Sequence, residues 1–160
     1  MSVRLTPRGT RGLGFPKVAP WLRAIFNFMQ IAMFRLSGGR MRVQGRPLLL
    51  LTTTGAKTGH RRETTLGWFP DEERGDDSRL IAASNAGAAA HPSWYVNLAR
   101  RPDGAAIEVD GRKFAVSAES LDGAERDRAW KRIVALAPGY GKYEQQTDRE
   151  IPVVRLTPKT

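Results

Sequence analysis

The centre of the chain contains two stretches with the composition of β-strands, separated by a short turn. Residues 48–54 form a continuous apolar and β-branched run, residues 55–59 (Gly-Ala-Lys-Thr-Gly) have the composition of a turn, and residues 61–69 form the second strand. Two strands joined by a tight turn form an antiparallel hairpin. This hairpin argues against a fold in which parallel strands alternate with crossover helices.

The later part of the chain repeats this arrangement. Asp110-Gly111 separates two apolar stretches, and this dipeptide is the strongest short signal for a two-residue hairpin turn. Short strands that lie mostly in hairpins, with helices before and between them, predict an α+β fold: an antiparallel sheet of about six strands, closed into a small barrel with flanking helices. The expected strands span residues 48–54, 61–69, 79–83, 105–109, 113–118 and 151–156.

Residues 18–36 have the spacing of a helix that is apolar around most of its circumference. Pro20 suits the first helical turn, and Gly38-Gly39 ends the helix. Such a helix must bury more than one face or lie against a lipid bilayer. It is a poor transmembrane span because polar and charged residues interrupt it. These residues are Arg23, Asn27, Gln30 and Arg35.

The chain is expected to form one domain preceded by an arm. Residues 1–17 combine Pro and Gly with scattered Arg, which predicts a flexible basic arm, and residues 18–160 form a single domain. Two further helices are expected at residues 91–100 and 122–136, the second ended by Pro138-Gly139. The 160 residues include no Cys, which excludes disulfide frameworks, zinc ribbons, thiol nucleophiles and iron–sulfur clusters.

Positive charge is concentrated in the first part of the chain. The net charge is +10, but residues 1–62 contain 12 Lys or Arg and no Asp or Glu. A localised positive field indicates an anionic partner: nucleic acid, an anionic membrane surface, or a small molecule rich in phosphate or carboxylate groups. Nucleic acid is disfavoured because no aromatic residues are interleaved with the basic ones of the central turn and no groove-reading helix is evident.

Side chains that catalyse reactions on their own are scarce in the sequence. It has no nucleophile elbow and no evident carboxylate pair, and the two histidines, His60 and His91, are too few and too isolated for a metal site, so no metal is expected. If the protein is an enzyme, a cofactor therefore supplies the reactive chemistry.

Residues 52–62 are the most informative segment. They combine threonine hydroxyls, two glycines, one Lys and two Arg at the end of a strand, and they include no acid. Exposed backbone N–H groups and cations of this kind converge on a phosphate. The alternative is a solvated hairpin tip whose charges serve solubility.

A second segment, residues 82–98, is rich in small residues. Such residues let a flat ring approach the backbone, and Trp94 and Tyr95 are candidates for the walls of a pocket. The alternative is that Trp94 and Leu98, four residues apart, anchor a helix in the core. Asn97 is compatible with either interpretation.

Four stretches occur in a distinctive order and spacing: LLLLTTTGAKTGHRRETTLGWF, LIAASNAGAAAHPSWYVNLARRP, EVDGRKFAVSA and GYGKYEQQTDREIPVVRL. Together they resemble the deazaflavin-dependent nitroreductase family of actinobacteria, and the resemblance covers about residues 18–158. It implies a split β-barrel that binds coenzyme F420, an 8-hydroxy-5-deazaflavin whose tail is a phosphate followed by oligoglutamate. This polyanion is the kind of partner that the local excess of positive charge requires.

The resemblance implies roles for individual residues. The small-residue loop lies along the deazaflavin ring in this family, so Ser84, Asn85 and Ala86 are expected to offer backbone N–H or hydroxyl contacts, with Trp94 nearby. Many relatives have Lys where Asn85 stands, which implies a weaker or differently held tail. The phosphate and the first glutamates are expected to contact Thr54, Gly55, Ala56, Lys57, Thr58, Gly59, Arg61 and Arg62.

Tyr140 and Tyr143 match tyrosines that border the substrate pocket in the family, and with Ser84 they are the expected catalytic residues. Ala137 stands where a third tyrosine occurs in some relatives, which implies a more open pocket. The implied reaction is hydride transfer from F420H2 to a small electron-poor acceptor: a quinone, an activated alkene or a nitro compound. Tyr140 or Tyr143 either supplies the accompanying proton or shapes the pocket.

Two other functions are compatible with the sequence. One is an FMN-binding split-barrel oxidoreductase, and the other is a non-enzymatic deazaflavin carrier or membrane-surface module that uses residues 1–36. The expected location is the cytoplasm, at the inner face of the cell membrane if residues 1–36 bind anionic lipid. In the competing interpretation, helix 18–36 packs against the barrel or against a second copy in a homodimer.

Overall fold

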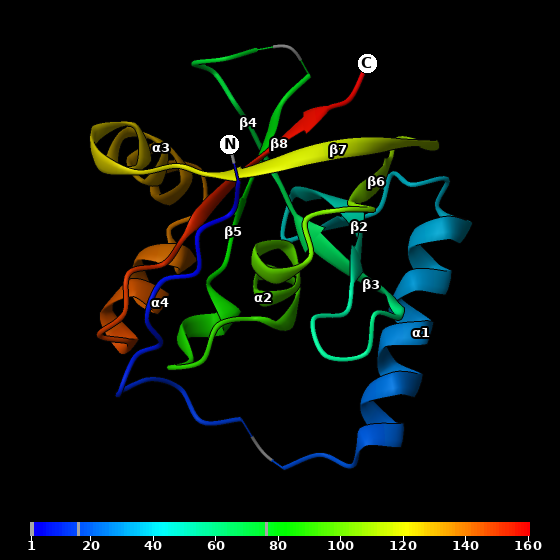
Figure 1. The fold of residues 1–160 in the computed structure, drawn as a ribbon, viewed down its shortest axis with the longest axis horizontal. Coiled ribbons are helices and arrows are strands. Elements are labelled where there is room, and N and C mark those ends of the chain that lie inside the picture. Colours follow the sequence, from blue (N-terminus) through cyan, green and yellow to red (C-terminus); the bar gives the residue numbers. More distant parts are fainter. Residues whose placement is uncertain (1, 16, 76) are drawn as a thin grey trace.

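The computed structural model describes residues 2–15, 17–75 and 77–160 (Figure 1). Its strands form one curled antiparallel sheet, a half-barrel with helices around it, which confirms the expected α+β split-barrel fold. The strands are β1 (Arg42–Val43), β2 (Arg46–Thr54), β3 (Arg61–Gly67), β4 (Phe69–Pro70), β5 (Arg79–Ala82), β6 (Ala106–Val109), β7 (Arg112–Ser120) and β8 (Val153–Pro158). The helices are α1 (Pro20–Leu36), α2 (Ser93–Arg100), α3 (Gly123–Leu136), α4 (Gly139–Gln146) and the short 3-10 helix η1 (Asn85–Gly87).

Hairpins organise the sheet, as the sequence predicts. β2 and β3 pair from Leu48↔Gly67 to Thr54↔Arg61. β6 and β7 are joined through Asp110 and Gly111, whose φ angles of 51° and 77° are typical of the tight turn that this dipeptide favours. The strand order is β1-β2-β6-β7-β8-β5-β4, with β3 paired to β2, because the long β7 pairs with β6 in its first half and with β8 in its second.

The stretch 61–69, expected as one strand, is divided in the structure. β3 ends at Gly67, and β4 pairs with β5 instead of β2. The Trp68 N–H still donates to the Pro47 carbonyl (3.2 Å) before the chain moves to the other side of the half-barrel. Because the apolar pattern continues across the division, the sequence does not mark where one strand stops and the next begins.

The structure corrects the expectation that Pro138-Gly139 only ends a helix. α3 ends at Leu136 as predicted, but Pro138 also precedes α4, which begins at Gly139. Pro is tolerated at a helix start, where its missing N–H has no helical partner. α4 is short and contains two glycines, which hide its helical pattern. It places Tyr140 and Tyr143 about one turn apart.

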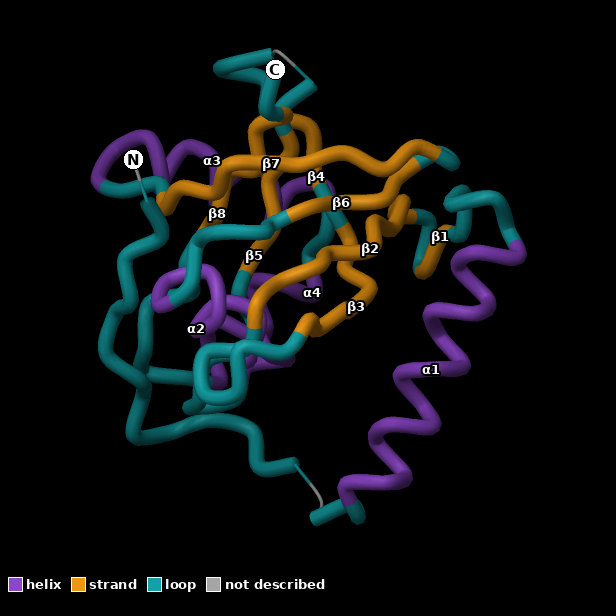
Figure 2. Tube along the Cα trace, turned by 45° about the vertical axis from the view of Figure 1, so that its right-hand side comes forward, coloured by secondary structure: helices purple, strands orange, loops and turns teal. Residues whose placement is uncertain are grey.

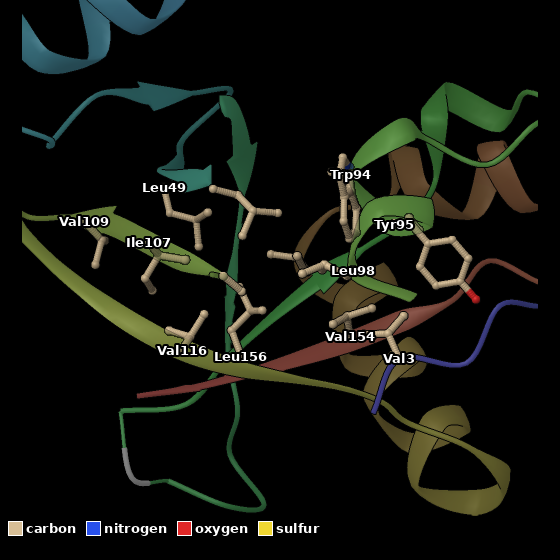
Figure 3. Close-up of a cluster of buried hydrophobic side chains, with 14 residues drawn as sticks. Val3, Leu49, Trp94, Tyr95, Leu98, Ile107, Val109, Val116, Val154 and Leu156 are labelled. Carbon is tan, nitrogen blue, oxygen red and sulfur yellow. The ribbon is translucent and has the colours of Figure 1, made fainter. Parts of the chain in front are cut away.

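Two apolar clusters form the core. The first fills the half-barrel, where side chains of the sheet such as Leu49 and Ile107 meet Trp94 and Leu98 of α2 (Figure 3). Leu98 is fully buried there, so its assignment as a core anchor is confirmed. The second cluster lies under α3, and Tyr140 and Tyr143 pack at its edge.

The N-terminal segment crosses the molecule before it reaches α1 (Figures 1 and 2). Its described residues form no helix or strand, but Val3 is buried in the first cluster. The Gly9 N–H donates to the Ala89 carbonyl (2.8 Å) and the Leu13 N–H to the Gly87 carbonyl (3.0 Å). The segment is therefore packed on the domain rather than free of it, through backbone contacts that composition does not reveal.

α1 lies outside the sheet with an unusual distribution of side chains (Figure 2). The Asn27 side chain donates to the Glu63 carbonyl (3.1 Å), and Arg35 pairs with Glu63 (2.9 Å), so polar groups face the sheet together with the buried Phe34. Within the described ranges, no helix is both long and apolar enough to cross a membrane. The large apolar side chains of α1 that face solvent are Trp21, Leu22, Ile25, Phe26, Phe28, Met29, Met33 and Leu36.

Candidate functional site

Two loops that carry predicted site residues lie at the same end of the half-barrel, with α2 between them (Figure 1). The basic loop, residues 55–60, joins β2 to β3. The small-residue loop, residues 83–88, follows β5 and contains η1. The structure therefore brings together the two segments that the sequence analysis singled out.

Asn97 of α2 anchors the basic loop. Its Oδ1 accepts a hydrogen bond from the Ala56 N–H (2.9 Å), and its Nδ2 donates to the Thr53 hydroxyl (3.1 Å). The loop is closed by a bond from the Gly55 N–H to the His60 carbonyl (2.7 Å), and the turn requires the positive φ of Gly59. Sequence reasoning left the role of Asn97 open, because a lone Asn carries no signal of its partner.

Arg61 and Arg62 lie on opposite faces of the β2–β3 hairpin, because successive residues of a strand alternate. Arg62 pairs with Thr53 on the inner face, and Arg61 pairs with Thr54 on the outer face. Arg61 also lies 3.3 Å from a carboxylate oxygen of Glu63, a neutralisation that the acid-free segment 52–62 did not indicate. In the described part of the chain, Lys57 and Arg62 have no carboxylate at ion-pair distance.

Arg61 borders a hollow of about 370 Å³ on the outer face of the hairpin. Lys113 of β7 is the second cation there, and the sequence analysis did not single it out. A larger hollow of about 490 Å³ surrounds Arg155 and its carboxylate partners and contains none of the predicted site residues. The residues that line the outer-face hollow are Thr52, Thr53, Thr54, Gly59, Arg61, Gly104, Ala106 and Lys113.

The small-residue loop has a left-handed backbone. Asn85 and Ala86 have φ angles of 46° and 53°, and the Asn85 side chain donates to the Ala90 carbonyl (3.0 Å), so it stabilises its own loop. The N–H groups of Ser84, Asn85 and Ala86 have no acceptor within the described ranges. Gly87 packs so closely on α4 that an added Cβ would lie 2.7 Å from Gln146 Oε1.

Tyr140 and Tyr143 meet next to the small-residue loop, against which α4 packs. Their rings contact edge to face with centres 5.5 Å apart, and the Arg46 guanidinium lies 5.0 Å from the centre of the Tyr140 ring. Burial raises the pKa of Tyr140, so its hydroxyl stays protonated at neutral pH. Sequence reasoning missed Arg46, because an arginine at the start of a strand gives no sign of a distant aromatic partner.

The aromatic residues of α2 contribute to the core. Trp94 is 7% exposed and packs edge to face on Tyr95, with ring centres 6.2 Å apart. Tyr95 is fully buried, and its hydroxyl donates to the Arg4 carbonyl, so the expectation that Tyr95 walls a pocket is wrong. His91 lies against the Tyr95 ring. Among the residues that the structure describes, no three His, Asp or Glu side chains are grouped closely enough to hold a metal ion.

Comparisons with known proteins agree with this fold. The sequence profile of the F420H(2)-dependent quinone reductase family matches residues 27–158. An F420H(2)-dependent quinone reductase of Mycobacterium tuberculosis H37Rv is 39% identical over 132 residues, which cover 79% of this chain and 85% of that protein. A second protein of the same strain, named for the same activity, is 31% identical over 113 residues, 71% of this chain and 91% of its own.

Solved structures give the same result. An F420-H2 dependent reductase superimposes with a TM-score of 0.59 at 36% identity and covers 72% of this chain and 98% of its own. A structure described as a domain-swapped dimer superimposes with a TM-score of 0.61 at 31% identity, over 82% of this chain and 98% of its own. The chain therefore belongs to the F420H(2)-dependent quinone reductase family and is an oxidoreductase that uses coenzyme F420.

Proposed function

We propose that this chain reduces a quinone with F420H2 at the end of the half-barrel that carries the basic loop and the small-residue loop. Two kinds of binding group at this end carry the proposal. The cations of Lys57 and Arg62 have no carboxylate partner among the described residues, and the N–H groups of residues 84–86 have no acceptor there. The cations suit the phosphate and carboxylates of the coenzyme tail, and the N–H groups suit the carbonyl oxygens of its ring. These residues therefore fit F420.

The protein's contribution is positioning. When bound, F420H2 supplies a hydride from ring carbon 5. Asn97 fixes the basic loop that carries Lys57, and Arg62 lies on the inner face of the hairpin, so these two cations hold the tail. Arg61, which is on the outer face, contributes to the field around the tail and to the outer-face hollow. Holding the coenzyme in one place converts hydride transfer into a step between two fixed partners.

A hydride supplies two electrons and one hydrogen, so reduction of a quinone to a hydroquinone requires one further proton. Tyr140 is a neutral hydroxyl donor at neutral pH, and its raised pKa keeps it so well into the alkaline range. Tyr143 lies beside Tyr140, and Ser84 lies in the small-residue loop against which α4 packs. We assign the acceptor site to this group of hydroxyls. A tyrosine that gives its proton to the quinone oxygen recovers one from water.

A titration with F420 and, separately, with FMN tests the coenzyme assignment. F420 is expected to bind more tightly than FMN, and its affinity is expected to fall as the salt concentration rises. Lys57→Ala and Arg62→Ala should each weaken F420 binding by about 1–3 kcal/mol if each side chain makes a charge-assisted contact. Lys131→Ala, an exposed lysine of α3, is the matched control and should bind normally. Equal or tighter binding of FMN contradicts the proposal.

A second proposal concerns the exposed apolar face of α1. We propose that it binds an anionic membrane surface, which suits an enzyme whose acceptor is a membrane quinone. Aromatic side chains such as Trp21 and Phe28 are exposed on the helix, and basic residues such as Arg8 and Lys17 precede it. Cations near anionic lipid contribute about 1 kcal/mol each, while the aromatic residues insert at the interface.

Co-sedimentation with liposomes tests this attachment. Full-length protein is expected to sediment with vesicles that contain phosphatidylserine at low salt, and Phe28→Glu should abolish this while leaving F420 binding intact. Gln145→Glu at an exposed position of α4, which also adds one negative charge, is a charge-matched control. If the protein ignores these vesicles and sediments as a dimer that Phe28→Glu dissociates, a second copy covers the helix and the membrane proposal fails.

A further inference from the structure

Arg149, between α4 and β8, is bound to the backbone of the small-residue loop. Its Nη1 donates to the Ala83 carbonyl (3.0 Å), its Nη2 to the Ser84 carbonyl (2.8 Å) and its Nε to the Ala88 carbonyl (2.9 Å). The side chain is 5% exposed. One guanidinium group therefore connects the beginning and the end of the loop.

This cation is buried without an acid. Within the described ranges, no carboxylate lies at ion-pair distance from Arg149, whereas the other buried arginine near the C-terminus, Arg155, pairs with Glu119 (3.2 Å) and Glu125 (2.6 Å). Burial lowers the pKa of Arg149. The partners of this buried charge are carbonyl dipoles and the Nδ1 of His91 (3.4 Å), all of them neutral, which is an unfavourable arrangement for stability alone. The conformation of the loop indicates what the arrangement contributes.

The loop adopts a backbone that its residues disfavour. Ser84 is in the right-handed helical region (φ −74°, ψ −35°), and the next two residues, Asn85 and Ala86, have positive φ. Positive φ is uncommon for residues other than glycine and persists where the surroundings impose it. A right-handed residue followed by a left-handed one turns successive N–H groups toward one concave side, the arrangement that binds negatively polarised oxygens.

We propose that Arg149 is a positioning residue for hydride transfer: it locks the small-residue loop in the backbone conformation that presents the N–H groups of residues 84–86 to the deazaflavin ring. This inference rests on the ring position proposed above. Arg149 binds the loop carbonyls from one side, so the N–H groups remain for the coenzyme on the other. A small displacement of the ring separates the hydride donor from its acceptor and slows the reaction even when the coenzyme is still bound.

Arg149→Lys tests the proposal because it keeps the charge but loses the three-pronged geometry. The measurement is single-turnover oxidation of bound F420H2 by the soluble quinone menadione, well below the melting temperature. We expect the rate constant to fall about 10- to 100-fold, as a misplacement of about 1 Å can cause. The absorption spectrum of bound F420 should shift as well, because the N–H groups that contact the ring have moved.

Arg126→Lys is the matched control. Arg126 on α3 is also buried and also donates to a backbone carbonyl, that of Ile151 (2.6 Å), but it packs against the second core cluster, with its guanidinium 5.0 Å from the centre of the Trp130 ring. It should lose a similar amount of thermal stability with little change in the single-turnover rate or in the spectrum. If Arg149→Lys at matched stability keeps the wild-type rate and spectrum, the proposal is wrong.

A second variant covers the case in which Arg149→Lys does not fold. Ala86→Val leaves Arg149 in place but adds a β-branched side chain at φ 53°, which drives the loop out of its left-handed conformation. It should reproduce the slow hydride transfer and the spectral shift, and a wild-type rate in this variant also overturns the proposal.

The two proposals fail in different ways. If the wild-type protein does not bind F420, or if Lys57→Ala and Arg62→Ala bind it normally, the proposed coenzyme site is wrong and this inference fails with it. If those variants weaken F420 binding as expected while Arg149→Lys and Ala86→Val transfer hydride at the wild-type rate, the site stands and only the positioning role of Arg149 is wrong.

Discussion

Asn97 connects the basic loop to the core through two hydrogen bonds of opposite direction. It accepts from the Ala56 backbone and donates to the Thr53 side chain, and it is itself buried. A carboxamide is the side chain that can do both at once. The orientation of the loop therefore depends on one residue of α2 as well as on the loop's own glycines.

Replacing Asn97 should affect stability and coenzyme binding together. Asn97→Ala leaves a backbone N–H and a buried hydroxyl without partners, which should cost about 1–3 kcal/mol of unfolding free energy. It should also weaken F420 binding, because the loop loses its anchor. Urea denaturation and F420 titration measure the two effects. Asn97→Asp keeps the acceptor for the Ala56 N–H and should retain more of the binding; a normal affinity in Asn97→Ala contradicts the anchoring role.

His91, between the N-terminal segment and Arg149, makes the stability of the fold depend on pH. Burial lowers the pKa of His91 below its usual value of 6.5, and the neighbouring charges of Arg149 and Arg8 lower it further, while the Thr6 and Pro7 backbone opposes this. The ring is accordingly neutral, with Nε2–H donating to the Thr6 carbonyl (2.8 Å) and Nδ1 facing Arg149 (3.4 Å). The Tyr95 ring, which is also uncharged, packs against the His91 ring.

This lowered pKa gives a stability effect with a definite sign. Below about pH 6.5 the unfolded chain takes up a proton at His91 that the folded chain does not, so the unfolding free energy should decrease as the pH falls through that range. His91→Gln should remove this component. Melting curves of both proteins between pH 8 and pH 5 measure it, and parallel pH dependences would show that His91 does not contribute.

At the scale of elements, hairpins were predicted well and helix α4 was not. The hairpins were predictable because Asp110-Gly111 and the 55–59 turn are local signals that specify a backbone conformation. α4 and the division of β3 from β4 depend on tertiary contacts: Tyr140 packs into the second cluster, and β4 pairs with the distant β5. Local patterns carry no information about such partners.

The same distinction applies to the candidate site. Residue types and turns indicated the basic loop and the small-residue loop, which the fold brings to one end of the half-barrel. The separation of Arg61 from Arg62 follows from strand alternation, once the register is known. The role of Asn97 stayed open and Arg46 and Arg149 were not identified, since each acts on residues that are distant in the sequence.

α4 supplies both tyrosines, so substitutions on it separate turnover from coenzyme binding. Tyr140→Phe and Tyr143→Phe should lower the turnover of menadione while F420 affinity stays nearly unchanged, because the rings still pack and only the hydroxyls are lost. The Tyr140 hydroxyl is protonated throughout the neutral range, and its raised pKa moves its ionisation further into alkaline pH, so its contribution should be constant across neutral pH. Steady-state kinetics and F420 titration of each variant provide the measurements. An equal loss of F420 affinity would place the hydroxyls at the coenzyme instead.

On the scale of the whole molecule, the N-terminal segment links distant parts of the fold. It contributes Val3 to the core, crosses the small-residue loop and then reaches α1 (Figure 1). Gly12 passes so close to this loop that an added Cβ would lie 2.4 Å from the Ala89 nitrogen. Asp148, next to Arg149, accepts from the Thr10 N–H (2.8 Å), so the segment and the loop are held by neighbouring residues.

Releasing this segment should be visible by limited proteolysis. The hydrogen bonds from Thr10 and Arg11 lower the pKa of Asp148 to about 2. Its stabilising contribution is therefore present above the usual value of 3.8 and is lost as the pH falls toward 2. Asp148→Asn should speed tryptic cleavage after Arg8 and Arg11 at neutral pH. Glu150→Gln, an exposed neighbour, is the control, and equal cleavage in both variants would show that Asp148 does not hold the segment.

Apart from the buried Phe34, α1 turns polar groups toward the sheet and large apolar side chains toward solvent, so salt should affect its surface and the coenzyme site differently. Ammonium sulfate strengthens apolar association while it screens charge. Raising its concentration therefore promotes self-association through the apolar surface of α1. At the same time it weakens the binding of an anionic coenzyme by Lys57 and Arg62. Retention on a phenyl column and retention of F420 should consequently change in opposite directions along one salt gradient, which provides a way to prepare the coenzyme-free protein.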